Sequence, residues 1–317
     1  MQQDVNTAPG PTPTVSVAIT AFNSEKWITR AIESVLMQQT TFPIEIVVAD
    51  DCSTDGTAAI AEDLRQHHPD KLRVLARQKN VGIQRNYFET FGMCRGKYIA
   101  WLDADDYWTD PDKLAIQVQT MEDDPSVAVC CHFVRWVTPD TGVQRNFPSL
   151  SPGRYDLSEL VRRNFLPSPS IMFRNGIQRK LPEWYFDLAP VTDWPIWILA
   201  AQTGDILLLD RMMADYQLTP NSSFAGQSQL KGNQADIRFY DKVESILPAQ
   251  FHRSARSQRG IRYENVAYIL RKQGDYRGSR EAAVKAFRSP SLLDNIPSKT
   301  KSLIAAVVRE AQSRLRN

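Results

Sequence analysis

Three aspartates follow an apolar run in the middle of the chain. Asp103, Asp105 and Asp106, with Ala104 between them, come directly after residues 98–102. Adjacent carboxylates repel one another unless a cation lies among them, and a hard divalent cation prefers oxygen ligands and also binds diphosphates. The alternative is a solvated acidic turn that caps the next helix. Because Asp110 and Pro111 already offer an N-cap and a first helical residue, we favour a metal–diphosphate site.

A second acidic cluster comprises Asp50 and Asp51, followed by Ser53 and Asp55. A carboxylate in such a place could accept a hydrogen bond from a uracil or thymine imide, or from a ribose hydroxyl. The pattern is equally typical of an Asx-turn that leads into a helix. The sequence leaves both interpretations of this cluster open.

Two further sites each hold a candidate group. Arg85, which follows Asn80 and Gly82, could donate charge-assisted hydrogen bonds to a diphosphate, or could be an ordinary surface arginine. Asp193 precedes an apolar helical pattern and could be a helix cap. It could also be a general base that accepts the proton of a sugar hydroxyl.

The elements around these residues alternate between strand and helix. Apolar β-branched runs predict strands at residues 15–20, 44–49, 72–76 and 98–102. Helical spacing predicts helices at residues 25–38 and 57–67 and between the last two strands. This order predicts an α/β fold with a parallel sheet, in which ligands bind beyond the carboxyl ends of the strands. The polar clusters follow those ends.

The later part of the chain is predicted to continue this fold and then become helical. The patterns predict a helix after Pro111, a turn at residues 140–142, a helix from Asp193 to Gln202 and strands at residues 127–137, 168–173, 206–209 and 212–218. Beyond residue 229, helical patterns with basic faces run to the end. Residues 263–287 resemble one tetratricopeptide-type hairpin around Gly274.

Composition bounds the class of protein. The chain has 317 residues, 42% of them hydrophobic and 23% charged, which is typical of a globular protein. No run approaches the roughly 18 apolar residues of a membrane span. The four cysteines lack metal-ligand spacing, so we expect buried free thiols and a cytoplasmic location. We expect a flexible lead at residues 1–14, a main domain at 15–228 and a basic α-helical region at 229–317.

Charge is distributed unevenly along the chain. The net charge is +2, but residues 231–317 hold 18 basic and 8 acidic residues, and the remainder holds 20 basic and 28 acidic residues. The basic region could contact an anionic membrane surface at its periphery, or could pack as a solvated basic face on the acidic domain. We expect no nucleic-acid partner.

Taken together, the motifs resemble those of the family 2 glycosyltransferases with the GT-A fold. The resemblance lies in residues 15–23, 47–57, 80–86 and 96–106, in this order, and continues more weakly through residues 170–174 and Asp193 to about residue 218. It implies a Rossmann-like, mostly parallel sheet flanked by helices. The C-terminal helical extension lies outside the resemblance.

The resemblance also implies roles for individual residues. Asp51 would contact the donor base, Asp103 and Asp105 would be the Asp-X-Asp that holds ribose and Mn²⁺ or Mg²⁺, and Asp106 would share the metal. Asp193 would be the catalytic base of an inverting transfer. The donor-binding set would comprise Ala21, Phe22, Asn23, Asp51, Asn80, Gly82, Arg85, Asp103 and Ala104.

Two departures from the family pattern lead to an alternative. Residues 216–220 lack the histidine that many members carry near the metal, and Thr192 stands where a second acid is common. The main hypothesis is an inverting transferase that uses a nucleotide-sugar donor, with UDP or dTDP favoured, and a glycan or lipid-linked acceptor in surface polysaccharide synthesis. The alternative is a non-catalytic nucleotide-sugar-binding or scaffold protein. The sequence leaves the sugar, the linkage and the oligomeric state open.

Overall fold

The computed structural model describes residues 12–138, 142, 144–219 and 228–290, together with residues 300, 302 and 305–307. The chain divides into two compact units. The first is drawn from Met1–Leu160, Asn164–Phe186 and Asp193–Thr219, and the second from Val161–Arg163, Asp187–Thr192 and Pro220–Asn317. Most of the predicted flexible lead and part of the predicted turn at residues 140–142 lie outside the described residues.

The first half of the first unit alternates strictly between strand and helix, as the sequence predicts. Its elements are β1 (Val15–Ala21), α1 (Ile28–Leu36), β2 (Ile44–Asp50), α2 (Thr57–His67), β3 (Leu72–Ala76), α3 (Ile83–Met93) and β4 (Tyr98–Asp103). The elements that follow are β5 (Tyr107–Trp108), α4 (Lys113–Asp123), β6 (Val127–Val137), β7 (Gln144–Phe147), β8 (Gly153–Tyr155), α5 (Leu157–Arg162), η1 (Ser168–Ser170), β9 (Met172–Arg174), η2 (Ile177–Lys180), η3 (Glu183–Asp187), α6 (Trp194–Ala200) and β10 (Asp205–Gln217).

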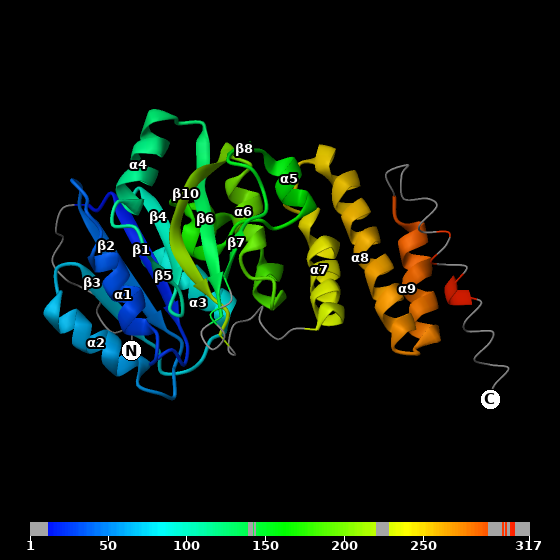
Figure 1. The fold of residues 1–317 in the computed structure, drawn as a ribbon, viewed down its shortest axis with the longest axis horizontal. Helices are drawn as coiled ribbons and strands as arrows, with labels where there is room; N and C mark the ends of the chain where they lie inside the picture. Colours follow the sequence, from blue (N-terminus) through cyan, green and yellow to red (C-terminus); the bar gives the residue numbers. More distant parts are fainter. Residues whose placement is uncertain are drawn as a thin grey trace. The chain divides into compact units, whose positions relative to one another are not determined.

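These strands form one mixed sheet with helices on both faces (Figure 1). Its order is β3-β2-β1-β4-β9-β6-β10-β5, with β7 beside β6 and β8 beside β10. The neighbours from β3 to β4 are parallel, and so are β6 and β10, whereas β9 runs antiparallel between β4 and β6. The prediction of an α/β fold with a mostly parallel sheet flanked by helices is confirmed.

The alternation of side chains along β1 and β4 separates two apolar layers. On one face, Val17, Ile19 and Leu102 pack with α1 and α4 in a fully buried cluster. On the other face, the Trp101 ring lies 5.0 Å from the ring of Phe91 in α3 and 5.3 Å from that of Trp197 in α6. The sheet is therefore buried on both faces, which explains why its strands read as continuous apolar runs.

Three local predictions were wrong. The predicted strand at residues 168–173 begins with the 3₁₀ turn η1, because Pro169 cannot donate to a strand ladder. The predicted strands at 206–209 and 212–218 are one strand, β10, in which bulges after Leu209 absorb the extra residues. The helix after Pro111 begins at Lys113 with Asp112 as its N-cap residue, so Asp110 is not the cap.

The described part of the second unit contains three long helices. They are α7 (Gln229–Val243), α8 (His252–Lys272) and α9 (Tyr276–Arg288). The 3₁₀ turn η4 (Ala249–Phe251) leads directly into α8. Small side chains such as Ala282 and Ala283 are buried between α8 and α9. Gly274, with a φ of 87°, reverses the chain between these two helices. The hairpin predicted around Gly274 is therefore present, whereas the position of the domain boundary stays a prediction.

Two compositional expectations can be compared with the described residues. Cys94, Cys130 and Cys131 are buried and free, and Cys52 is free and half-buried. Within the described ranges, no helix combines the length and apolar character needed to cross a membrane.

Candidate active site

The carboxyl end of β2 places Asp51 beside the segment that precedes α3. Asp51 is 3% exposed, and its carboxylate accepts hydrogen bonds from the backbone N–H groups of Val81 (2.8 Å) and Gly82 (3.0 Å). The Asn80 side chain donates to the Asp51 carbonyl oxygen at 3.0 Å. Gly82 has a φ of 87°, a conformation that favours glycine. The structure thus brings Asp51, Asn80 and Gly82 together.

The end of β1 lies beside Asp51. The Asp51 N–H donates to the Ala21 carbonyl oxygen at 2.9 Å. Asn23, with a φ of 51°, accepts a hydrogen bond from the Thr54 N–H at 2.9 Å, which ties the loops after β1 and β2 together. Phe22, which lies between Ala21 and Asn23 in the sequence, is 49% exposed. A large exposed ring beside buried polar groups is suited to contact a ligand.

Asp103 ends β4 on the face of the sheet that α3 and α6 cover. The parallel register pairs it with Thr20, whose hydroxyl donates to Asp103 Oδ1 at 3.0 Å. The same oxygen accepts from Tyr87 (2.9 Å) and Trp101 (3.2 Å), and Oδ2 accepts from Ser168 at 2.7 Å. Four donors from four elements therefore fix this carboxylate. Since β2 and β4 both flank β1, the strands that carry Asp51 and Asp103 lie two strand spacings apart, roughly 10 Å.

Asp105 and Asp106 are held by the end of β10. Thr219 donates to Asp105 Oδ2 at 3.1 Å, and the Gln217 side chain donates to the Asp105 carbonyl oxygen. Asp106 is 2% exposed, and its Oδ1 accepts from the Gln217 N–H at 2.7 Å. Burial, followed by the charges of Asp105 and Asp103, raises the pKa of Asp106 well above its usual value. Gln217 and Thr219 thus occupy the stretch that lacks the family's histidine.

The chemistry of this cluster fits a divalent cation only in part. All its candidate ligands are carboxylate oxygens, which Mn²⁺ and Mg²⁺ accept, and Asp106 Oδ2 is buried without a hydrogen-bond partner among the described residues. However, no group of three acidic, histidine or cysteine side chains in the described part of the chain is arranged to hold a metal. A cation here would therefore need oxygen ligands from a bound molecule to complete its coordination.

Asp193 precedes α6 and is half-buried on the same face of the sheet as Asp103. Its carboxylate accepts hydrogen bonds from Asn164 and, at 3.2 Å, from the Trp197 indole. Asp193 makes no side-chain cap on its own helix. Burial raises the pKa of Asp193, the hydrogen bonds from Asn164 and Trp197 lower it, and the nearby charge of Asp103 raises it, with a net upward shift. A carboxylate with a raised pKa is a stronger proton acceptor.

The structure does not bring Arg85 to this cluster. Its side chain is 48% exposed, lies 3.9 Å from Glu89 and covers the ring of Phe186. A different arginine, Arg77, is nearly buried and lies 3.9 Å from Asp51 Oδ1. Sequence reasoning missed Arg77 because it follows a strand without any recognisable motif.

Other residues that contact the acidic groups were also missed. Tyr87 and Ser168 donate to Asp103, and Asn164 and Trp197 donate to Asp193. Tyr87 could have been suggested by helical spacing, because it directly follows the 80–86 motif and lies one turn before Phe91 on the buried side of α3. Asn164 and Ser168 lie in an irregular segment, where spacing carries no information about direction.

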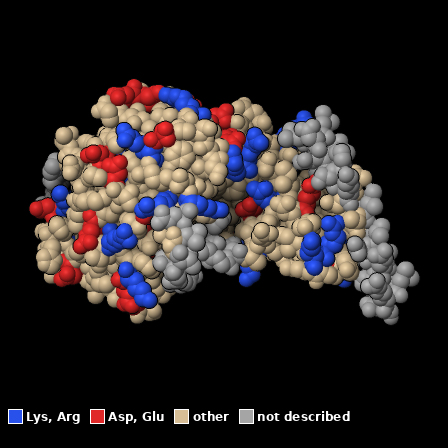
Figure 2. All heavy atoms as spheres, viewed as in Figure 1, with Lys and Arg blue, Asp and Glu red and all other residues tan. Residues whose placement is uncertain are grey.

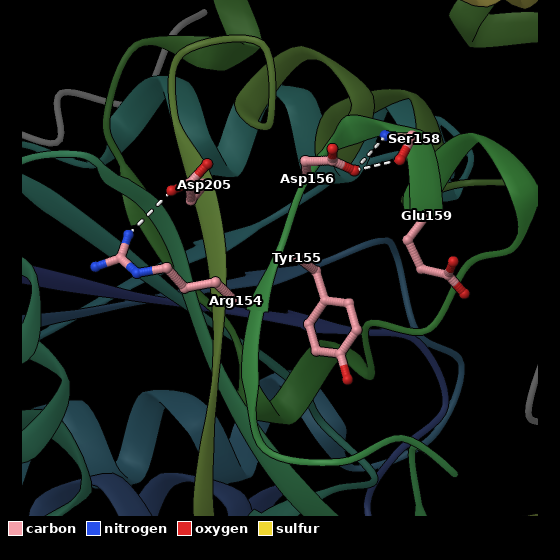
Figure 3. A pocket seen from close by; sticks show the side chains of 6 residues that line it. All are labelled: Arg154, Tyr155, Asp156, Ser158, Glu159 and Asp205. Atoms are coloured by element: carbon pink, nitrogen blue, oxygen red, sulfur yellow. Dashed lines mark hydrogen bonds and ion pairs between the residues drawn. The ribbon is translucent and has the colours of Figure 1, made fainter.

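A separate hollow in the first unit is lined by other residues (Figure 3). Arg154 on its wall pairs with Asp205 at 3.0 Å, and Asp156 accepts from the Ser158 N–H at 2.9 Å. The polar groups named here already have partners, and none of the predicted site residues lines this hollow. We therefore keep the candidate site at the carboxyl edge of the sheet.

Solved structures share this fold. The Staphylococcus aureus TarS fragment 1–349 in complex with UDP-GlcNAc superposes with a TM-score of 0.64 at 20% identity, covering 86% of this chain and 81% of that one. The mannosyltransferase PcManGT from Pyrobaculum calidifontis, in complex with GDP-Man and Mn²⁺, gives a TM-score of 0.58 at 17% identity over 96% of this chain and 87% of that one. The fold is that of the GT-A glycosyltransferases.

The family follows from sequence. The model of glycosyl transferase family 2 matches residues 16–179, so the chain belongs to this family. The Mycobacterium tuberculosis protein Rv1520 is 35% identical over 205 residues, which cover 64% of this chain. The match spans 58% of the length of that relative.

Proposed function

We propose that the chain is an inverting glycosyltransferase that moves a sugar from a nucleotide diphosphate donor to a glycan or lipid-linked acceptor in surface polysaccharide synthesis. The observation that most supports this function is the gathering of acidic groups at one edge of the sheet. Asp51 follows β2 and Asp103 ends β4, the two strands that flank β1, and the half-buried Asp193 lies close enough to Asp103 for the two charges to interact.

The donor would lie over the ends of β1, β2 and β4. Asp51 is proposed to read the base, and the set of Ala21, Phe22, Asn23, Asn80, Gly82 and Ala104 to surround the nucleoside. The similar structures bind UDP-GlcNAc and GDP-Man. A carboxylate that accepts an imide N–H suits uracil and thymine, so UDP and dTDP remain the favoured donors and GDP belongs in any test. Arg85 would need to change rotamer to reach a diphosphate.

A divalent cation would be held by Asp105 together with the donor, with Asp103 and Asp106 beside it. When bound, Mn²⁺ or Mg²⁺ stabilises the negative charge that develops on a departing diphosphate. The Asp103 carboxylate already accepts four hydrogen bonds from the protein, so we assign it to the ribose and to orientation of the loop that follows β4. Gln217 and Thr219 hold the same loop from β10.

Asp193 would act on the acceptor. Its carboxylate takes the proton of the attacking hydroxyl while the acceptor oxygen bonds to the anomeric carbon. The bond from that carbon to the diphosphate oxygen breaks, and its electron pair leaves with the nucleoside diphosphate. A single displacement of this kind inverts the anomeric centre. General-base assistance contributes roughly 10²–10⁴-fold to such a rate.

The second unit is proposed to bring the enzyme to the inner face of a membrane, where a lipid-linked acceptor would lie. On the face drawn in Figure 2, Lys and Arg side chains gather over the region of α8 and α9. Arg271 and Lys272 lie near the exposed ring of Tyr268, a pairing of cations with an amphipathic ring that suits a lipid headgroup region.

Turnover separates this function from a non-catalytic scaffold on the same fold. The purified chain is incubated with UDP-, dTDP- and GDP-sugars and Mn²⁺, and release of nucleoside diphosphate is followed with and without glycan acceptors. We expect at least one donor to be turned over. Calorimetric binding of a donor, combined with no turnover of any donor or acceptor in the panel, would instead favour the scaffold.

A further inference from the structure

Asn164 contacts both oxygens of the Asp193 carboxylate. Its side-chain nitrogen lies 3.1 Å from Asp193 Oδ1 and 3.0 Å from Oδ2, so the amide spans the carboxylate. The Trp197 indole also donates to Oδ2, at 3.2 Å. These contacts fix the plane of the carboxylate, which decides where an acceptor hydroxyl can approach it.

The orientation of the Asn164 amide is itself determined by its surroundings. Its oxygen accepts a hydrogen bond from the Leu166 N–H at 3.2 Å, so its nitrogen must point to Asp193. The adjacent Phe165 and Leu166 are each 2% exposed, and the Phe165 ring packs 5.3 Å from that of Tyr155. The backbone that carries Asn164 is therefore anchored in the apolar core.

The same short segment also contacts Asp103. Ser168 donates to Asp103 Oδ2 at 2.7 Å, four residues after Asn164. Residues 164–168, which we name the bridging segment, thus contact the proposed base at one end and the Asp-X-Asp at the other. A displacement of this segment would alter both carboxylates together.

The charges around Asp193 make an uncharged hydrogen-bond donor important beside its carboxylate. Asp103 at the end of β4 faces it and raises its pKa. Tyr87 from α3, Tyr185 from η3 and Tyr216 from β10 have pKa values raised by burial and, among smaller causes, by the charge of Asp193. Among these groups, none is a cation that would hold Asp193 ionised. The hydrogen bonds from Asn164 and Trp197 favour the charged form instead.

We propose that Asn164 is a positioning residue for the transfer, which holds the Asp193 carboxylate in the orientation that receives the proton of the acceptor hydroxyl. The inference rests on the proposed function, since it requires Asp193 to be the base. Its role in the transfer would be exerted through Asp193, which its side chain contacts.

The test is a pH profile of kcat and of donor KM for the full chain. Replacement of Asn164 by alanine removes a donor to the carboxylate, so Asp193 loses its proton only at higher pH. We expect Asn164→Ala to lower kcat at neutral pH by roughly tenfold or more. The acid limb of its profile should move to higher pH, activity should partly recover at alkaline pH, and donor KM should stay within about twofold.

Two further variants keep the test decisive. Asn164→Asp is nearly isosteric and places a second carboxylate beside Asp193, so its acid limb should lie higher still. Asn146→Ala removes an exposed asparagine of β7 and should match the wild type. An unmoved acid limb in both Asn164 variants, or a raised donor KM at unchanged kcat, would overturn the inference. Normal turnover by Asp193→Asn would instead overturn the proposed function.

Discussion

At the residue scale, the acidic side chains of the site differ in their hydrogen bonds and in their burial. Asp103 accepts four hydrogen bonds, and both Asp51 oxygens accept backbone N–H groups. Asp105 is half-buried and is held by β10 through Thr219 and Gln217. Because it is only half-buried, a bound molecule can reach it, and we propose it as the carboxylate of the Asp-X-Asp that shares a cation with a bound diphosphate.

This difference predicts the effect of Asp105→Asn. The amide removes a negative charge without changing the size of the side chain, so affinity for UDP should fall by about tenfold or more in the presence of Mn²⁺, which is about 1.4 kcal/mol. Binding without metal should change little. Calorimetry of UDP with and without Mn²⁺ measures both effects. The matched control is Asp63→Asn, at an aspartate whose side chain is 70% exposed. Equal metal-dependent affinity in both variants would remove Asp105 from the cation site.

At the element scale, the start of β4 sets the position of the Asp-X-Asp that follows it. Gly96 precedes β4, and its N–H donates to the Ser16 hydroxyl at 2.8 Å. A Cβ at Gly96 would lie 2.5 Å from the Ser16 nitrogen and 2.8 Å from the Val15 carbonyl carbon. Such close approach to backbone atoms leaves no room for a methyl group.

We therefore expect Gly96→Ala to lower the free energy of unfolding by about 1–3 kcal/mol, because β1 and β4 must separate. Gly92→Ala in α3 is the matched control, since a Cβ there meets nothing within 4 Å. That change should be neutral or stabilise by up to about 1 kcal/mol. Urea unfolding monitored by tryptophan fluorescence measures both. Equal stability of the two variants would contradict the close packing of β1 against the β4 entry.

The elements predictable from sequence are those with a strong apolar period. The strands β1 to β4 and the helices between them were predicted because their buried faces leave unbroken runs. The bulged β10 was predicted as two strands, because exposed Asp210 and Arg211 resemble a turn. Of the candidate site, Asp51, Asn80 and Gly82 come together, while the roles assigned to them stay predictions.

What could not be predicted is the direction in which side chains of irregular segments point. Asn164 and Ser168 reach carboxylates through a segment whose backbone has no period, so no spacing indicates where they point. Arg85 was named because it lies in a motif, whereas Arg77, which the sequence analysis did not consider, is the arginine beside Asp51. In both cases the side chain meets a partner that is 26 or more residues away in the sequence, so only the tertiary fold determines the contact.

At the scale of the whole molecule, charge is separated along the chain. Part of the positive charge of α8 is neutralised within the second unit, where Arg256, Arg259 and Arg262 pair with Glu244, Asp241 and Asp236. Arg271 and Lys272 lie at the other end of α8, close to Tyr268, which is 51% exposed. This end of α8 is the stronger candidate for an anionic surface.

We predict that the full chain sediments with vesicles of phosphatidylglycerol and phosphatidylcholine at low salt, and less at high salt, because screening shortens the electrostatic range. The double variant Arg271→Glu with Lys272→Glu should sediment several-fold less. Lys71→Glu with Lys79→Glu makes the same charge change at exposed positions of the first unit and should have a smaller effect. Equal sedimentation of the two double variants would exclude this end of α8 as the membrane contact.

The central claim is that the acidic edge of the sheet both binds a nucleotide sugar and transfers its sugar. The most direct measurement compares donor binding by calorimetry with product formation, for the wild type, Asp193→Asn and the exposed control Asp187→Asn. We predict that Asp193→Asn binds the donor as the wild type does and loses about 10²-fold or more of its turnover, while Asp187→Asn loses neither. Near-normal turnover by Asp193→Asn would contradict the account.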